Sequence, residues 1–73
     1  MSGMSDTLVR MANQIARNFM ALGHDRAVAA TADHIAKFWD PRMKEKALAM
    51  LDAGEGEFSG PARAALKQLV TDR

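Results

Sequence analysis

The sequence contains no cysteine. This absence excludes a disulfide framework, a thiolate zinc site and a cysteine nucleophile, and it fits a reducing compartment. The chain also lacks any run of about 18 apolar residues, and its first residues lack the charged start and apolar stretch of a signal peptide. We therefore expect a cytoplasmic protein that has no membrane partner.

A dominant charge is also missing. Lysine and arginine number 10 against 9 aspartate and glutamate, so the formal net charge is only +1, and both signs are spread along the chain. A protein without a strong overall field does not attract nucleic acid or an anionic membrane over long range. We therefore expect no nucleic acid as the main partner.

Large apolar side chains are few. Hydrophobic residues make up 48% of the 73 positions, but many of them are alanine, which buries little area. The aromatic residues are Phe19, Phe38, Trp39 and Phe58. A chain of this size forms one domain at most, and its buried area barely offsets the entropy lost on folding, so such chains commonly rely on disulfides, metals or a partner. Because disulfides are excluded and no metal motif stands out, we expect a partner.

What the chain does contain is helical periodicity. The first predicted helix starts at an N-cap, Ser5 or Asp6, and ends near Leu22 before a stop at Gly23. Its apolar stripe consists of Leu8, Met11, Ala12, Ile15, Phe19 and Leu22, and its polar half includes Arg10, Asn13, Gln14 and Arg17. The stripe covers nearly half of the helix circumference, which is typical of a helix packed on a core.

Two more helices meet at Asp40-Pro41. The second is predicted to start at Asp25 as its cap and to end near Phe38; its apolar side carries Val28, Ala32, Ile35 and Trp39. Proline disfavours the helical region for the residue before it and suits the first turn of the next helix. Asp40 is therefore the expected N-cap of a third helix that ends near Ala53 and buries Met43, Ala47, Met50 and Leu51.

The last helix follows the acidic, glycine-containing turn of residues 54–57. Ser59 is its expected cap, Pro61 lies in its first turn, and one face carries Ala62, Ala65, Leu66, Leu69 and Val70. The short connections favour helices packed against sequence neighbours. The sequence thus predicts an all-α fold, a compact bundle of about four short helices, with residues 6–73 as a single domain after a disordered extension of residues 1–5.

The sequence shows no recognisable set of catalytic residues. The only side chains that act as bases near neutral pH are His24, expected as a polar turn residue, and His34, expected at the edge of an apolar stripe near Phe38. Neither has a candidate nucleophile nearby, and Ala30 and Phe38 occupy the positions where a second metal ligand to His34 would be needed. The carboxylates in residues 54–57 would repel phosphate. We expect no catalytic, metal-binding or cofactor-binding site.

A basic cluster leaves a second class of function open. Arg42, Lys44 and Lys46 lie at the start of the third predicted helix, after a tight turn, as in a helix-turn-helix protein that binds nucleic acid. Glu45 interrupts the cluster, and phosphate binding requires a wider basic surface. A small nucleic-acid-binding regulator is the alternative, and a solvated basic patch is the simpler interpretation.

Adjacent aromatic residues are harder to explain. Phe38 and Trp39 cannot both point into one thin core, so we expect one of them at a boundary. Aromatic residues and arginine are enriched among interface anchors. Side chains that could bind a partner protein are therefore Phe38, Trp39, Arg42, His34, Arg10, Asn13 and Gln14. The alternative is that both aromatics complete the core and that solvation alone explains the polar face of the first helix.

Three segments resemble a known family: residues 8–16 (LVRMANQIA), residues 32–35 (ADHI) and residues 38–43 (FWDPRM). Together they are similar to the delta subunit of cytoplasmic NAD-dependent formate dehydrogenases, with the last of them the most specific. Similarity extends from about Asp6 into the last helix. The turn containing Glu55 and Glu57 departs from the glycine-rich, apolar turn of the family.

The resemblance implies a small non-catalytic subunit of a complex that oxidises formate and reduces NAD. In this family a large subunit holds molybdenum or tungsten on a bis-pterin guanine dinucleotide together with iron-sulfur clusters, and a flavin-bearing subunit carries FMN. The delta subunit would support assembly, cofactor insertion or stability of the large subunit. It would do so by docking through Phe38 and Trp39, or by contacting the pterin pyrophosphates with Arg10, Arg17, Lys37 or Arg42. Self-association of the isolated chain stays open.

Overall fold

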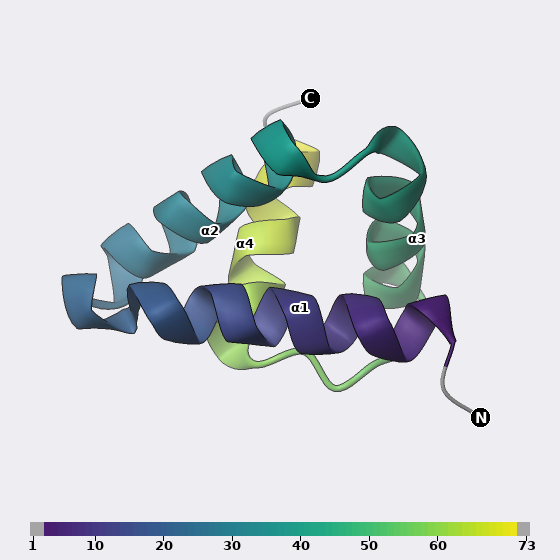
Figure 1. Ribbon diagram of the computed structural model, residues 1–73, viewed down its shortest axis with the longest axis horizontal. Coiled ribbons are helices and arrows are strands. Elements are labelled where there is room, and N and C mark those ends of the chain that lie inside the picture. Colours follow the sequence, from purple (N-terminus) through teal and green to yellow (C-terminus); the bar gives the residue numbers. More distant parts are fainter. Residues whose placement is uncertain (1–2, 72–73) are drawn as a thin grey trace.

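The computed structural model describes residues 3–71 of the chain. In this range four α-helices and one 3-10 turn follow one another: α1 (Met4–Phe19), η1 (Met20–Leu22), α2 (His24–Phe38), α3 (Pro41–Asp52) and α4 (Gly60–Thr71). Figure 1 shows α1 crossing in front, α2 rising away from the end of α1, α4 between them, and α3 upright on the right, beyond the end of α2. The described residues contain no strand, so the predicted all-α bundle is confirmed.

The first helix starts earlier than predicted. Its N-cap is Gly3, which has no side chain to cap the helix. Both the N–H and the hydroxyl of Thr7 donate to the Gly3 carbonyl. Ser5 and Asp6 therefore lie inside the first turn, where the charge of Asp6 suits the positive end of the helix dipole. Met4 and Ser5, expected in a disordered extension, are helical, and residues 1–2 of that extension lie outside the described residues.

The junction between the first two helices also differs in detail. The helical segment that α1 and η1 form ends before Gly23, as predicted. Gly23 has a φ of +95°, which glycine adopts readily. However, α2 begins directly at His24, and Gly23 is its N-cap without a side-chain hydrogen bond. The prediction that Asp25 caps this helix is therefore wrong. Asp25 lies in the first turn, where its charge can still favour the helix start.

The boundary between α2 and α3 forms as its sequence predicts. Trp39 leaves the helical region with φ −85° and ψ 138°, and the Met43 N–H donates to the Asp40 carboxylate at 2.9 Å. Pro41 occupies the first turn, where its missing N–H costs nothing. The Lys44 ammonium donates to the Ala36 carbonyl at 3.2 Å and so ties α3 to the end of α2.

The last helix begins at a serine cap, also as predicted. The Ala62 N–H donates to the Ser59 hydroxyl at 3.3 Å, and the Arg63 N–H donates to the Ser59 carbonyl at 2.8 Å. Val70, expected on the packed face of α4, is instead 51% exposed. The buried part of that face is formed by Ala62, Ala65 and Leu66.

The core is rich in alanine, which lets the helices approach closely. It consists of Leu8, Ala12, Ala16, Ile35, Trp39, Ala47, Met50, Phe58, Ala62 and Leu66. The centre of the buried stripe on α1 is Leu8, Ala12 and Ala16, whereas Met11 and Leu22, expected in that stripe, are 37% and 50% exposed. The buried stripe of α1 thus follows its small residues, and the larger Met11 in α1 and Leu22 in η1 remain at the surface.

Candidate functional site: a groove between the first two helices

The adjacent aromatic residues point to different environments. Trp39 is 4% exposed and belongs to the core, whereas Phe38 is 72% exposed. They diverge because α2 ends at Phe38 and Trp39 adopts an extended conformation, which turns its side chain inward. The expectation that one aromatic lies at a boundary is confirmed. Trp39 was also expected among the side chains that bind a partner, and its burial does not fit that role.

Phe38 is not isolated on the surface. Its ring lies 4.7 Å from the imidazole of His34, one helical turn earlier, with an angle of 41° between the two planes. His34 is half-buried, and within residues 3–71 its ring nitrogens form no hydrogen bond. The imidazole therefore packs against Phe38 in a tilted arrangement, and its ring nitrogens remain able to hydrogen-bond to solvent or a partner.

A groove between α1 and α2 brings several of the expected residues together. It has a volume of about 480 Å³ and is lined by Thr7, Arg10, Met11, Gln14, Ile15, His34 and Trp39. We call it the α1–α2 groove. Its apolar part is formed by Met11, Ile15 and an edge of Trp39, and its polar rim by Arg10, Gln14 and His34. Periodicity placed Arg10 and His34 on different helices without showing that they would meet.

Asn13, also expected to bind a partner, serves the fold instead. Its side-chain N–H donates to the Glu57 carbonyl at 2.9 Å, and its side-chain oxygen accepts from the Ser59 N–H at 2.7 Å. One amide thus fastens the connection between α3 and α4 onto α1. Its hydrogen-bonding groups are occupied within the chain, so we leave it out of the docking surface.

Arg42 lies apart from the groove. It is exposed in the first turn of α3 and does not line the space between α1 and α2. Lys44, from the same basic cluster, is engaged with the end of α2 through the Ala36 carbonyl. One of the three cations that suggested a helix-turn-helix protein is therefore hydrogen-bonded within the fold. The described residues add no further cation to this basic cluster.

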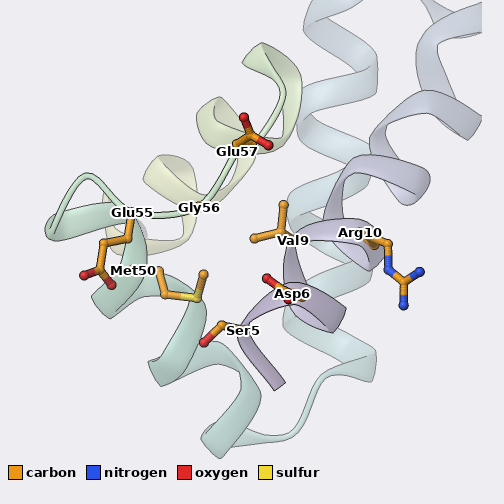
Figure 2. Close-up of a pocket in the computed structure, with 8 residues that line it drawn as sticks. All are labelled: Ser5, Asp6, Val9, Arg10, Met50, Glu55, Gly56 and Glu57. Atoms are coloured by element: carbon orange, nitrogen blue, oxygen red, sulfur yellow. The ribbon is translucent and has the colours of Figure 1, made fainter. Parts of the chain in front are cut away.

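A second hollow lies on the other side of α1. Figure 2 shows Val9 and Met50 pointing toward each other across it, with Asp6, Glu55 and Glu57 around the rim and the guanidinium of Arg10 directed away from Met50. Its volume is about 630 Å³. Asp6 comes from α1 and the two glutamates from the connection between α3 and α4, and Figure 2 shows that their carboxylates do not converge. No group of three histidine or acidic side chains in residues 3–71 could hold a metal ion.

The residues present do not fit an iron-sulfur cluster or a metal ion held by protein side chains. Iron-sulfur clusters are held mainly by cysteine thiolates, and the chain has no cysteine. The described residues offer no alternative metal ligand set.

Comparison with known proteins gives the family. Residues 7–66 match the family model described as the NADH-dependent formate dehydrogenase delta subunit FdsD. That range includes every residue lining the α1–α2 groove. No curated protein and no solved structure matches the chain. None of the helices in residues 3–71 has the length and apolarity needed to cross a bilayer. The chain belongs to the family of delta subunits of NADH-dependent formate dehydrogenases.

Proposed function

We propose that this chain is a non-catalytic accessory subunit of a cytoplasmic formate dehydrogenase complex and that it docks on the large catalytic subunit. Docking would support the assembly, cofactor insertion or stability of that subunit. The complex would carry molybdenum or tungsten on a bis-pterin guanine dinucleotide, iron-sulfur clusters and FMN, all in other subunits. The family match supports membership in such a complex, and the docking surface is our inference.

The observation that carries the docking surface is the α1–α2 groove with Phe38 beside it. Arginine, methionine and aromatic side chains are enriched in protein interfaces, and this surface contains Arg10, Met11 and Phe38. His34 connects the two parts because it lines the groove and stacks on Phe38. An apolar centre with a polar rim is the usual anatomy of an interface. This surface is therefore the best candidate for docking.

The accessory role follows from binding linkage. A subunit that binds only the folded form of its partner stabilises that form by about 2.7 kcal/mol when its concentration is 100 times the dissociation constant. The same linkage acts on this chain, whose small alanine-rich core leaves it little stability of its own. Each protein would then hold the other in its folded state.

A catalytic role lacks support from the described side chains. His24 is exposed at the start of α2, and His34 packs on Phe38 without a nucleophile beside it. Direct handling of the pterin cofactor has no specific observation in its favour either. Lys37, one of its candidate cations, already pairs with Asp33 at 3.1 Å on the helix surface.

Co-purification tests the proposal. The tagged chain, expressed in the organism that naturally makes it, should retain the large subunit together with molybdenum or tungsten. Mass spectrometry identifies the subunit, and metal analysis identifies the metal. A strain lacking the chain should accumulate less of the metal-loaded large subunit. Purification of the chain with nucleic acid, or without any other subunit while the large subunit loads normally, would overturn the proposal.

A further inference from the structure

Arg10 supplies the only formal charge among the residues that line the α1–α2 groove. Within residues 3–71 this guanidinium forms no ion pair, since Asp33 pairs with Lys37 and no carboxylate lies close enough to Arg10. Arg10 also lines the second hollow, whose rim carries Asp6, Glu55 and Glu57, but it pairs with none of them, and Figure 2 shows its guanidinium directed away from Met50. The groove thus presents a positive charge that has no paired carboxylate in the described residues.

We propose that the α1–α2 groove receives an acidic amphipathic segment of the large subunit. Its apolar side chains pack on Met11, Ile15 and Trp39, and one of its carboxylates pairs with Arg10. The inference rests on the proposed function, because it names what the large subunit inserts at the docking surface.

The apolar half of this segment is set by the groove. Met11 is 37% exposed and Ile15 is half-buried, and both line the groove together with Trp39, which is 4% exposed and forms its floor. Phe38 extends the apolar surface past His34. A methionine side chain adapts its shape to a bound apolar group, which suits a groove that must accept another chain's residues. A helix that packs one apolar face in a groove matches this arrangement.

The acidic half follows from the cost of covering Arg10. A guanidinium that is desolvated by a partner without a counter-charge weakens the complex, whereas a carboxylate can bind it through two parallel hydrogen bonds. Gln14 lies in the same lining, and the amide N–H that does not contact Asn18 can donate to the same carboxylate or to the segment's backbone. Charge complementarity therefore selects an acidic segment.

The same argument disfavours a second copy of this chain. In a symmetric dimer formed by this surface, each groove would face the same groove of its partner. The lining contains Arg10 and no acidic residue, so the contact would bring two arginines together without a carboxylate between them. A different chain with an acidic segment has no such conflict.

Photo-crosslinking in the assembled complex identifies the occupant. A benzophenone amino acid is placed at position 11 or 38, with position 46, an exposed lysine on α3, as the control. Positions 11 and 38 should crosslink to one peptide of the large subunit that contains aspartate or glutamate next to helically spaced apolar residues. Crosslinks to a second copy of this chain, or to a segment without a carboxylate, would overturn the inference.

A charge series tests the ion pair. Arg10→Glu should weaken retention of the large subunit by about tenfold or more, and Arg10→Lys should retain a larger share of the binding. Arg17→Glu is the matched control because it makes the same charge change on another exposed position of α1. Equal effects of Arg10→Glu and Arg17→Glu would overturn the inference, since they would reflect net charge alone. Thermal unfolding of each variant confirms that it is folded.

The outcomes separate the inference from the function on which it rests. If the wild-type chain does not retain the large subunit at all, the proposed function fails. If the wild-type chain retains it while positions 11 and 38 crosslink elsewhere and Arg10 behaves like Arg17, only the groove's assignment fails.

Discussion

The side-chain oxygen of Asn13 accepts a hydrogen bond from the Ser59 N–H at 2.7 Å, although 46 positions separate the two residues. The same side chain donates to the Glu57 carbonyl at 2.9 Å. These contacts hold the connection before α4 against α1. They also position Phe58, which lies between the two contacted residues and is 5% exposed in the core.

Replacing Asn13 should therefore destabilise the protein. Asn13→Ala removes both contacts and leaves the half-buried Ser59 N–H without its acceptor, which should lower the free energy of unfolding by about 1–3 kcal/mol. Chemical denaturation monitored by circular dichroism measures the loss. Gln14→Ala is the control, because its amide contacts only Asn18 on the helix surface and its loss should cost about 0.5 kcal/mol or less. Equal stability of the two variants would show that the Asn13 contacts contribute nothing.

Gly56 gives a second prediction about the same connection. Its φ is +83°, and a Cβ at this position would lie 3.0 Å from Met50 Cε and 3.0 Å from Val9 Cγ2. Gly56→Ala should therefore combine a left-handed backbone cost of about 1–2 kcal/mol with crowding that adds about 1–3 kcal/mol. Gly54→Ala is the matched control, since Gly54 has φ +72° with open space around it. Thermal unfolding of the two variants should show the larger loss for Gly56→Ala, and a reversed order would contradict the crowding.

The Asp40 cap should also be measurable. Asp40→Ala removes the acceptor of the Met43 N–H and should lower the free energy of unfolding by about 1 kcal/mol. Asp40→Ser restores a capping oxygen and should recover most of that loss. If Asp40→Ala unfolds at the wild-type temperature, the carboxylate serves a purpose other than capping.

What could be predicted from the sequence is mostly local. The boundary at Asp40-Pro41 and the Ser59 cap depend on residues a few positions apart, and both form as predicted. Asn13 was expected on a solvent-exposed polar face, because its partners lie in a distant turn that periodicity does not describe. Phe58 was missed as a core residue because it stands outside any periodic segment. A large aromatic residue directly after the acidic, glycine-containing turn was the available signal.

The groove was predictable in its residues and not in its geometry. Arg10 and Gln14 on one helix and His34 on another were candidates from the polar and boundary positions of each helix. Their place around one groove depends on how α1 and α2 pack against each other, which the hydrophobic spacing within a single helix does not describe. Hydrophobic spacing weights large apolar residues, so it placed Met11 in the core when it lies at the groove.

Substitutions at Phe38 and Trp39 should affect different properties, the first the binding of the large subunit and the second the stability of this chain. Trp39→Ala removes a side chain that is 4% exposed and should cost about 3–5 kcal/mol of unfolding free energy, enough to threaten the fold of so small a chain. Phe38→Ala removes a ring that is 72% exposed and should change stability by about 0.5 kcal/mol or less. If Phe38 is part of the docking surface, Phe38→Ala should nevertheless retain clearly less large subunit in a pull-down. Val70→Ala, which trims another exposed apolar side chain, is the control and should bind normally. Wild-type retention by folded Phe38→Ala would remove Phe38 from the interface and leave the docking surface to the groove alone.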